Sequence, residues 1–164
     1  MGLVNEPIVR EQYRRIIRTD HSNFRLEETG LVVSTEIAYI GASPDALVRF
    51  DCCGEGLAEF KTTWTHTEKN SKEFAEISGT CLKVNEGPIK LVRNHMYYYE
   101  TQMLLGVSKK SYFDFFLMTS VGHYCEWIRL DEDLWQSCLP KLKVFFTEYI
   151  LPVLFTCDLK TEFQ

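Results

Sequence analysis

Three charged residues that could act together, Asp45, Glu59 and Lys61, lie within one short stretch of the sequence. Two carboxylates placed close together repel each other unless a cation joins them. Oxygen ligands of this kind suit a hard divalent ion such as Mg²⁺ or Mn²⁺, and the ammonium beside such a site then gains a chemical role. The residue types therefore predict a metal site, provided that the fold brings the three side chains together.

A β-hairpin would supply that positioning. Asp45 precedes the apolar run 47–50, Glu59 and Lys61 end a second apolar run, and the turn-rich segment 51–56 separates the two. Residues two apart in a strand share a face, so Glu59 and Lys61 point the same way. Pairing of the two strands would bring Asp45 close to both.

Motifs on both sides of this hairpin resemble those of a known nuclease family. The run 41–45, Gly-Ala-Ser-Pro-Asp, followed by Glu-Phe-Lys at 59–61, resembles the metal-binding core of the PD-(D/E)XK nucleases, specifically the YqaJ-type viral recombinase branch related to phage lambda exonuclease. The run 2–7 is similar to the first motif of that branch, and the run 97–102 is similar to its tyrosine- and glutamine-rich helix. The resemblance covers nearly the whole chain, with the motifs in the family's order.

The resemblance implies a magnesium-dependent deoxyribonuclease. One or two Mg²⁺ ions, replaceable by Mn²⁺, would be held by Asp45, Glu59 and the backbone carbonyl of Phe60. Lys61 would orient or deprotonate the attacking water, or offset phosphate charge. Glu6 would support a metal or its water, although on spacing alone it is a carboxylate that favours the positive end of a helix dipole.

The helix predicted over 94–105 carries Gln102, the residue that the resemblance places at the attacking water or the scissile phosphate. Asn94 is expected to cap this helix, and Gly106 to end it. Glu100 departs from the family pattern, in which glutamine is common at this position. A lone glutamine is usually a surface residue, so the role of Gln102 rests on the resemblance.

Basic, hydroxyl and aromatic residues outside the carboxylate pair are candidates for DNA contacts. The predicted first helix, Asn5 to Arg18, carries Arg10 and Arg14 four residues apart, a row that is usually a solvated face. The lysines of a predicted hairpin at 81–92 could line a DNA channel or lie on a plain surface. The residues that we expect to contact DNA are Ser43, Arg10, Arg14, Tyr98, Lys83 and Lys90.

The hydrophobic pattern predicts an α/β fold. The order of elements predicts helices that flank a central mixed β-sheet, with an α-β-β-β-α-β core, and the family resemblance implies that this is a restriction-endonuclease-like sandwich. After the first helix, the first strand is expected at 31–40, and a helix within 68–77. Later elements are strands at 112–119 and 123–129, a long helix capped by Asp131 that Pro140 could kink, and a packed extension from Pro152.

Composition sets the broad class of the protein. The 164 residues suffice for one domain, to which we assign residues 1–164. Hydrophobic residues at 45% and aromatic residues at 13% exclude a disordered chain. No apolar segment reaches the roughly 20 residues of a membrane span, and the scattered cysteines indicate reduced thiols in an intracellular protein. The net charge of −5 neither supports nor excludes DNA binding, because local charge decides it.

The sequence leaves three functions open. The first is a 5′-to-3′ exonuclease that acts on linear duplex DNA in recombination or DNA processing, as the lambda-type resemblance implies. The others are a restriction-like endonuclease, and a DNA- or protein-binding domain that has lost cleavage. The resemblance admits a single-strand annealing partner and a homo-oligomer, since a ring trimer is known among relatives. Relatives usually carry an upstream segment that receives the 5′-phosphate, and we expect that segment to be missing here.

Overall fold

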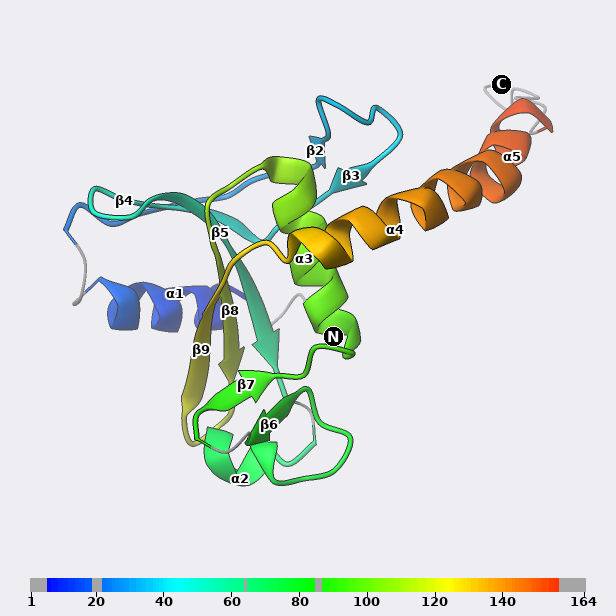
Figure 1. Ribbon diagram of the computed structural model, residues 1–164. Coiled ribbons are helices and arrows are strands. Elements are labelled where there is room, and N and C mark those ends of the chain that lie inside the picture. The colour runs from blue at the N-terminus through cyan, green and yellow to red at the C-terminus, as the bar shows by residue number, and fades with distance from the viewer. Residues whose placement is uncertain (1–5, 19–21, 64, 85–86, 157–164) are drawn as a thin grey trace, which may run out of the picture.

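A mixed sheet of five strands, in the order β1-β4-β5-β8-β9, forms the centre of the protein. The structure is a computed structural model that describes residues 6–18, 22–63, 65–84 and 87–156. The strands of the sheet are β1 (Arg25–Glu27), β4 (Ala46–Phe50), β5 (Gly54–Thr62), β8 (Phe113–Met118) and β9 (His123–Ile128). Helix α1 (Glu6–Ile17) covers one face and helix α3 (Met96–Ser108) lies on the other (Figure 1). The expected α/β sandwich with a mixed central sheet is confirmed.

Strand pairing fixes where the candidate site lies. β4 and β5 form the expected antiparallel hairpin, whose register runs from Phe50 opposite Gly54 to Ala46 opposite Ala58. β5 then pairs in parallel with β8, as far as Thr62 opposite Met118. The hairpin pairing therefore stops while β5 continues, which leaves one side of residues 59–62 beyond the end of β4.

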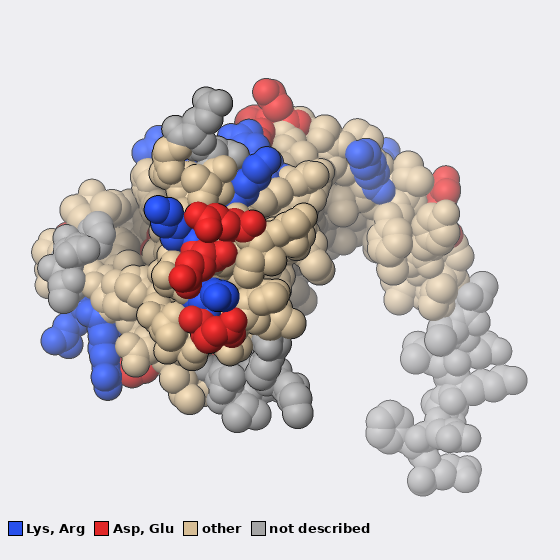
Figure 2. Space-filling view, turned by 90° about the horizontal axis from the view of Figure 1, so that it is seen from below, with Lys and Arg blue, Asp and Glu red and all other residues tan. Residues whose placement is uncertain are grey.

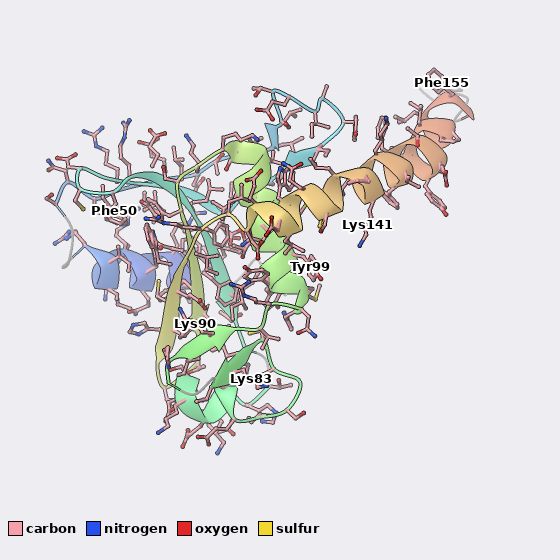
Figure 3. All side chains as sticks on the ribbon, in the orientation of Figure 1. Phe50, Lys83, Lys90, Tyr99, Lys141 and Phe155 are labelled. Atoms are coloured by element: carbon pink, nitrogen blue, oxygen red, sulfur yellow. The ribbon has the colours of Figure 1, made fainter. Side chains whose placement is uncertain are left out.

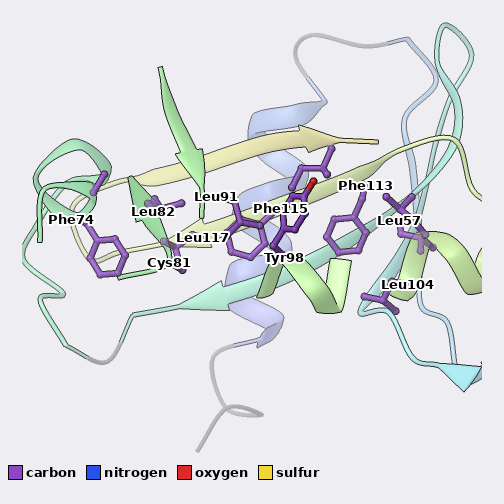
Figure 4. Packing of buried hydrophobic residues seen from close by; sticks show 13 residues of the cluster. Leu57, Phe74, Cys81, Leu82, Leu91, Tyr98, Leu104, Phe113, Phe115 and Leu117 are labelled. Carbon is purple, nitrogen blue, oxygen red and sulfur yellow. The ribbon is translucent and has the colours of Figure 1, made fainter. Parts of the chain in front are cut away.

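Side-chain alternation along β5 builds a hydrophobic core on each face of the sheet. On the α1 face, the ring of Tyr13 lies 5.2 Å from that of Phe60 and 5.4 Å from that of Phe116. The α3 face carries a larger cluster, in which Leu57 and Phe113 are buried (Figure 4). Because Phe60 packs into the α1 side, the side chains of its two neighbours in β5 point toward α3.

The predicted strand at 31–40 is wrong. Only Val32–Val33 (β2) is extended there, and it pairs with Gly41–Ala42 (β3) in a separate two-stranded sheet. The hydroxyl of Ser34 accepts hydrogen bonds from the backbone N–H groups of residues 36 and 37, and a local side-chain bond of this type turns the backbone away from a strand. The sequence analysis missed β1, which pairs with β4 instead.

The connection from β5 to α3 holds a short helix and a hairpin. Helix α2 (Ser71–Ala75) is shorter than the span expected within 68–77, and a capping box between Asn70 and Glu73 fixes its start. Strands β6 (Leu82–Val84) and β7 (Ile89–Leu91) form the predicted hairpin.

The ends of α3 differ from the prediction. His95, not Asn94, caps the helix: its ring Nδ1 accepts a hydrogen bond of 3.2 Å from the N–H of Tyr97. Gly106 lies inside the helix, which continues to Ser108, and a Cβ at Gly106 would come within 2.5 Å of the Trp135 ring. The glycine therefore permits close packing of α3 against the next helix and does not end α3.

Three consecutive helical segments end the described part of the chain and project from the body (Figure 1). They are α4 (Glu132–Phe145), the π-helical turn η2 (Phe146–Ile150) and α5 (Leu151–Thr156). Asp131 caps α4 as predicted, and Pro140 lies within this helix. The packed extension expected from Pro152 is wrong, since Phe155 is 81% exposed. Within the described ranges no helix is long and apolar enough to cross a membrane.

Candidate active site

The candidate site begins where the hairpin ladder stops. One residue before β4, the Oδ2 atom of Asp45 accepts a hydrogen bond of 2.7 Å from the backbone N–H of Phe60. In an extended strand the N–H and the C=O of one residue point to the same side. The carbonyl of Phe60 therefore faces the side on which the Asp45 carboxylate lies. The turn at 43–45 thus places the Asp45 carboxylate on the side of β5 that the Phe60 carbonyl faces.

Glu59 is a buried carboxylate with one oxygen unsatisfied. The residue is 6% exposed, and its Oε1 atom accepts a hydrogen bond of 2.8 Å from Lys61 Nζ. Among the residues that the structure describes, its buried Oε2 atom has no hydrogen-bond partner. Burial raises the pKa of Glu59 to about 7, and it also raises the pKa of Asp45 above its ordinary value. A buried, unpaired carboxylate oxygen is costly unless a cation approaches it.

Lys61 is held between two carboxylates. Its Nζ atom lies 2.8 Å from Glu59 and 3.0 Å from Glu100, and 4.8 Å from the centre of the Tyr97 ring. Burial by itself would lower the pKa of Lys61, but Glu59 and then Glu100 raise it above its ordinary value. The side chain is therefore a charged hydrogen-bond donor in this arrangement.

Glu100 and Tyr97 are members of the site that the sequence analysis did not assign. They lie three residues apart on α3, and residues at that spacing share a helix face. That face meets Lys61. Helical spacing, together with the need of a buried ammonium for a counter-charge, was the signal that could have identified both residues.

Gln102 lies away from this centre, at the connection between β9 and α4. Its Nε2 atom donates to the carbonyl of Arg129 at 3.2 Å, and its Oε1 atom accepts from the N–H of Asp131 at 2.6 Å. The residue is 2% exposed. The structure therefore does not bring Gln102 together with Asp45 and Glu59, and its amide joins α3 to the start of α4.

Glu6 and Arg10 border the site from α1. Arg10 Nη2 donates to the Glu6 carboxylate at 3.0 Å and to the backbone carbonyl of Asp45 at 2.8 Å, while Nη1 donates to Glu28 at 2.6 Å. Together with Ser43 these residues line a pocket of about 310 Å³. Arg10 thus ties α1 and the residue after β1 to the turn that carries Asp45.

The other residues expected to contact DNA lie elsewhere. Arg14 is exposed and 3.6 Å from Glu11 on the same helix. Lys83 and Lys90, on β6 and β7 (Figure 3), line a separate pocket of about 870 Å³ with Tyr98. The Tyr98 side chain is buried in the core beneath α3. On the face seen in Figure 2, acidic and basic side chains are interspersed and form no large area of one sign.

The groups of the site fit a divalent cation that completes its coordination with other oxygens. Within residues 6–18, 22–63, 65–84 and 87–156, no group of three or more His, Cys, Asp or Glu side chains could hold a metal ion. The chain would therefore supply Asp45, Glu59 and one carbonyl. Mg²⁺ is commonly bound in this way, through one or two carboxylates plus waters and substrate phosphates. The unpaired Glu59 oxygen is the structural observation that supports the fit.

Comparison with known proteins identifies the fold. No protein-family model and no curated protein matches the sequence. Two crystal structures of LHK-Exo share the fold: an alkaline exonuclease from Laribacter hongkongensis, and the same protein in complex with dAMP. Their TM-scores are 0.65 and 0.66; each is 21% identical to this chain and matches 94% of it and 69% of the LHK-Exo chain. At this identity the match establishes the architecture alone.

Proposed function

We propose that the protein is a metal-dependent DNA nuclease whose centre is formed by Asp45, Glu59 and Lys61. The observation that carries the proposal is the buried Glu59 oxygen, which has no partner in the described part of the chain and lies near the Asp45 carboxylate and the Lys61 ammonium. Packing alone gives no reason to keep these groups together, because a desolvated carboxylate pair is unfavourable without a cation. The fold shared with an exonuclease supports the proposal.

Asp45, Glu59 and the carbonyl of Phe60 would hold one or two Mg²⁺ ions, with Mn²⁺ as a substitute. When bound, the metal supplies Lewis-acid chemistry, which activates water and stabilises the charge that develops on the phosphate. Lys61 would donate a hydrogen bond to the attacking water or to a phosphate oxygen. Because its ammonium contacts the carboxylates of both Glu59 and Glu100, we assign it the role of a fixed cation rather than of a base.

Glu100 would keep the ammonium of Lys61 in place when the Glu59 carboxylate is shared with a cation, because it contacts Lys61 independently. Glu6 would act indirectly, through Arg10 and the turn of Asp45. Gln102 would then support the site indirectly, because its hydrogen bonds hold α3 in position. It would not contact the attacking water, which is the role that the resemblance implied.

The substrate that we propose is linear duplex DNA, degraded from a 5′ end in recombination or DNA processing. This proposal rests on the lambda-type resemblance of the motifs. The fold shared with LHK-Exo, which is an alkaline exonuclease and has been crystallised with dAMP, supports an exonuclease. A single-strand annealing protein would be a natural partner for such an activity.

A DNA- or protein-binding domain that has lost cleavage is the second candidate, favoured by one observation. Glu100 adds a carboxylate beside Lys61, at a position where the resembling family commonly carries glutamine. The extra negative charge would oppose the approach of a phosphate group unless metal neutralises the site.

The test is digestion of a linear duplex labelled at either end, with and without Mg²⁺, beside closed circular DNA. A 5′-to-3′ exonuclease releases the 5′ label as a mononucleotide, leaves circular DNA intact and requires the metal. Asp45→Asn should remove the activity, whereas Glu68→Gln, a change at an exposed residue on the loop before α2, should keep it. Cutting of circular DNA would indicate the endonuclease, and binding without metal-dependent cleavage would indicate the non-cleaving domain.

A further inference from the structure

A pocket of about 380 Å³ continues the candidate active site beyond Lys61. It lies between the end of β5, the segment from α2 to β6 and the start of α3 (Figure 1). Tyr97 joins the two places, because this residue lines the pocket and its ring centre lies 4.8 Å from Lys61 Nζ. A group bound in the pocket would therefore be next to the centre formed by Asp45, Glu59 and Lys61.

The pocket combines apolar side chains with hydroxyl-bearing ones. Phe74, Cys81 and Leu117 belong to the hydrophobic cluster of the α3 face, and Phe74 and Cys81 lie at one end of it (Figure 4). Threonine and serine residues also line the pocket: Thr62, Thr63, Thr65, Ser78 and Thr80. None of the described residues that line it is Asp, Glu, Lys or Arg. A phosphate would have no cationic partner among them, whereas a nucleobase, with flat apolar faces and polar edges, suits this lining.

Thr63 carries the most specific observation in the pocket. Its backbone N–H donates to the carbonyl of Met118 at 3.2 Å, so the pairing of β5 with β8 continues to this residue. Residues two apart in a strand share a face, which places the Thr63 side chain in the row of Glu59 and Lys61. Its hydroxyl oxygen is buried and has no hydrogen-bond partner within the described ranges. A buried hydroxyl costs free energy unless a bound group supplies the missing bond.

His95 supplies a hydrogen-bond donor whose position on the ring is fixed. Its Nδ1 atom accepts a hydrogen bond from the N–H of Tyr97 at 3.2 Å. Burial lowers the pKa of His95 and so favours the neutral ring, in which one nitrogen accepts and the other carries the hydrogen. The Nε2 atom is therefore the donor of this side chain, which also lines the pocket. The Thr80 hydroxyl, in contrast, lies 3.0–3.1 Å from three backbone carbonyls and is used within the fold.

We propose that this pocket binds the base of the terminal nucleotide whose phosphodiester bond is cleaved at the adjacent centre, an inference that rests on the proposed nuclease function. The Thr63 hydroxyl and His95 Nε2 would donate to acceptor atoms such as N7 or N3 of a purine and O2 of a pyrimidine. Because every base offers an acceptor, the pocket should tolerate any base. A terminal nucleotide that has no base should bind more weakly.

Fluorescence anisotropy of labelled linear duplexes in Mg²⁺ tests the pocket, with Asp45→Asn as the background so that binding is measured without cleavage. One duplex ends in an unpaired 5′ thymidine, and the other carries an abasic nucleotide at the same position. The thymidine-ended duplex should bind about tenfold more tightly, which is the size expected for one base held against an aromatic and apolar lining.

Substitutions at Thr63, made in the same background, test which group recognises the base. Thr63→Val removes the hydroxyl at nearly constant shape, and it should reduce the tenfold ratio about fivefold without lowering the melting temperature. Thr63→Ser keeps the hydroxyl and should keep the ratio. Thr147→Val, the matched change at an exposed threonine on η2, should also keep it.

The binding ratio and the cleavage assay fail separately. Equal affinity for the two ends, no measurable binding of either, or a ratio that Thr63→Val leaves unchanged would overturn the base pocket. Lack of metal-dependent digestion by the wild type would instead overturn the proposed function. Tenfold tighter binding that depends on the Thr63 hydroxyl supports the pocket whatever the rate of cleavage.

Discussion

Replacing Glu59 by glutamine should stabilise the protein in the absence of metal. Glutamine keeps the size of the side chain and an oxygen that can accept the hydrogen bond from Lys61, but it removes the charge that burial disfavours. Most substitutions of a buried, hydrogen-bonded residue destabilise a protein. We expect Glu59→Gln to raise the stability instead, because the buried Glu59 carboxylate binds a cation and does not itself stabilise the fold.

The size of the effect follows from the pKa of Glu59, which is raised from 4.5 to about 7 in the folded protein. A raised pKa means that the folded state holds the proton more tightly, so the stabilisation is complete below pH 4.5 and is lost as the pH rises through 7. At about 1.4 kcal/mol for each pKa unit, the loss is about 3 kcal/mol by pH 8–9. Glu59→Gln avoids this loss, which corresponds to a melting temperature higher by roughly 10 °C at that pH.

Thermal unfolding in a chelating buffer, at pH 5 and at pH 8.5, measures this difference. The melting temperatures of wild type and Glu59→Gln should be close at pH 5 and separate at pH 8.5. Glu68→Gln, an exposed change on the loop before α2, serves as the matched control and should follow the wild type at both values. If Glu59→Gln were no more stable than wild type at pH 8.5, the carboxylate would be paired by the protein itself, and the reasoning behind the metal site would be wrong.

Three further predictions concern neighbouring residues. Lys61→Ala should lower turnover by orders of magnitude while Mn²⁺ affinity stays equal or rises, since a cation opposes a divalent ion; calorimetric titration beside a nuclease assay measures both, and unchanged cleavage would make Lys61 a structural residue. Glu100→Gln should tighten DNA binding several-fold, because one negative charge is removed near the phosphate; a lower KM is the expected result, and a higher KM would contradict it. Gly106→Ala should destabilise by about 1–3 kcal/mol through the clash with the Trp135 ring, whereas Gly122→Ala, which meets open space, should cost little in a denaturant titration.

The fold could be predicted for those elements whose own residues show regular apolar spacing, a turn or a cap. The hairpin of β4 and β5, the pair β8 and β9 and the cap of α4 by Asp131 all follow from local patterns of apolar spacing, turn residues and caps. The strand expected at 31–40 failed because β-rich residues there compete with the Ser34 side-chain bonds to the backbone. β1 has only three residues, and its place in the sheet is set by pairing with β4, which no local pattern reports.

The candidate site was predictable in its hairpin part and not in its helical part. Asp45, Glu59 and Lys61 belong to one hairpin, so their spacing already determined that they meet. The rotation of α3 about its axis is set by packing, including the close contact of Gly106 with Trp135, and only the folded structure shows which helix face meets β5. That rotation presents Glu100 to the site and turns Gln102 toward the start of α4.

Helical spacing also failed to predict the environment of Arg10. Its spacing from Arg14 indicated a solvated face, yet its side chain is only 16% exposed and contacts Glu6, Glu28 and the Asp45 carbonyl. These partners come from three separate segments, so the sequence pattern of α1 alone could not show them. Arg14, one turn further on, remains exposed as the pattern suggests.

The central claim is that the buried carboxylate pair exists to hold a divalent cation. The most direct measurement is anomalous diffraction from crystals of the full chain grown with Mn²⁺. The account predicts an anomalous peak between the carboxylates of Asp45 and Glu59, close to the carbonyl of Phe60, and no peak there in Glu59→Gln. A wild-type crystal saturated with Mn²⁺ in which this position holds no peak, with the Lys61 ammonium as the sole cation at Glu59, would contradict it.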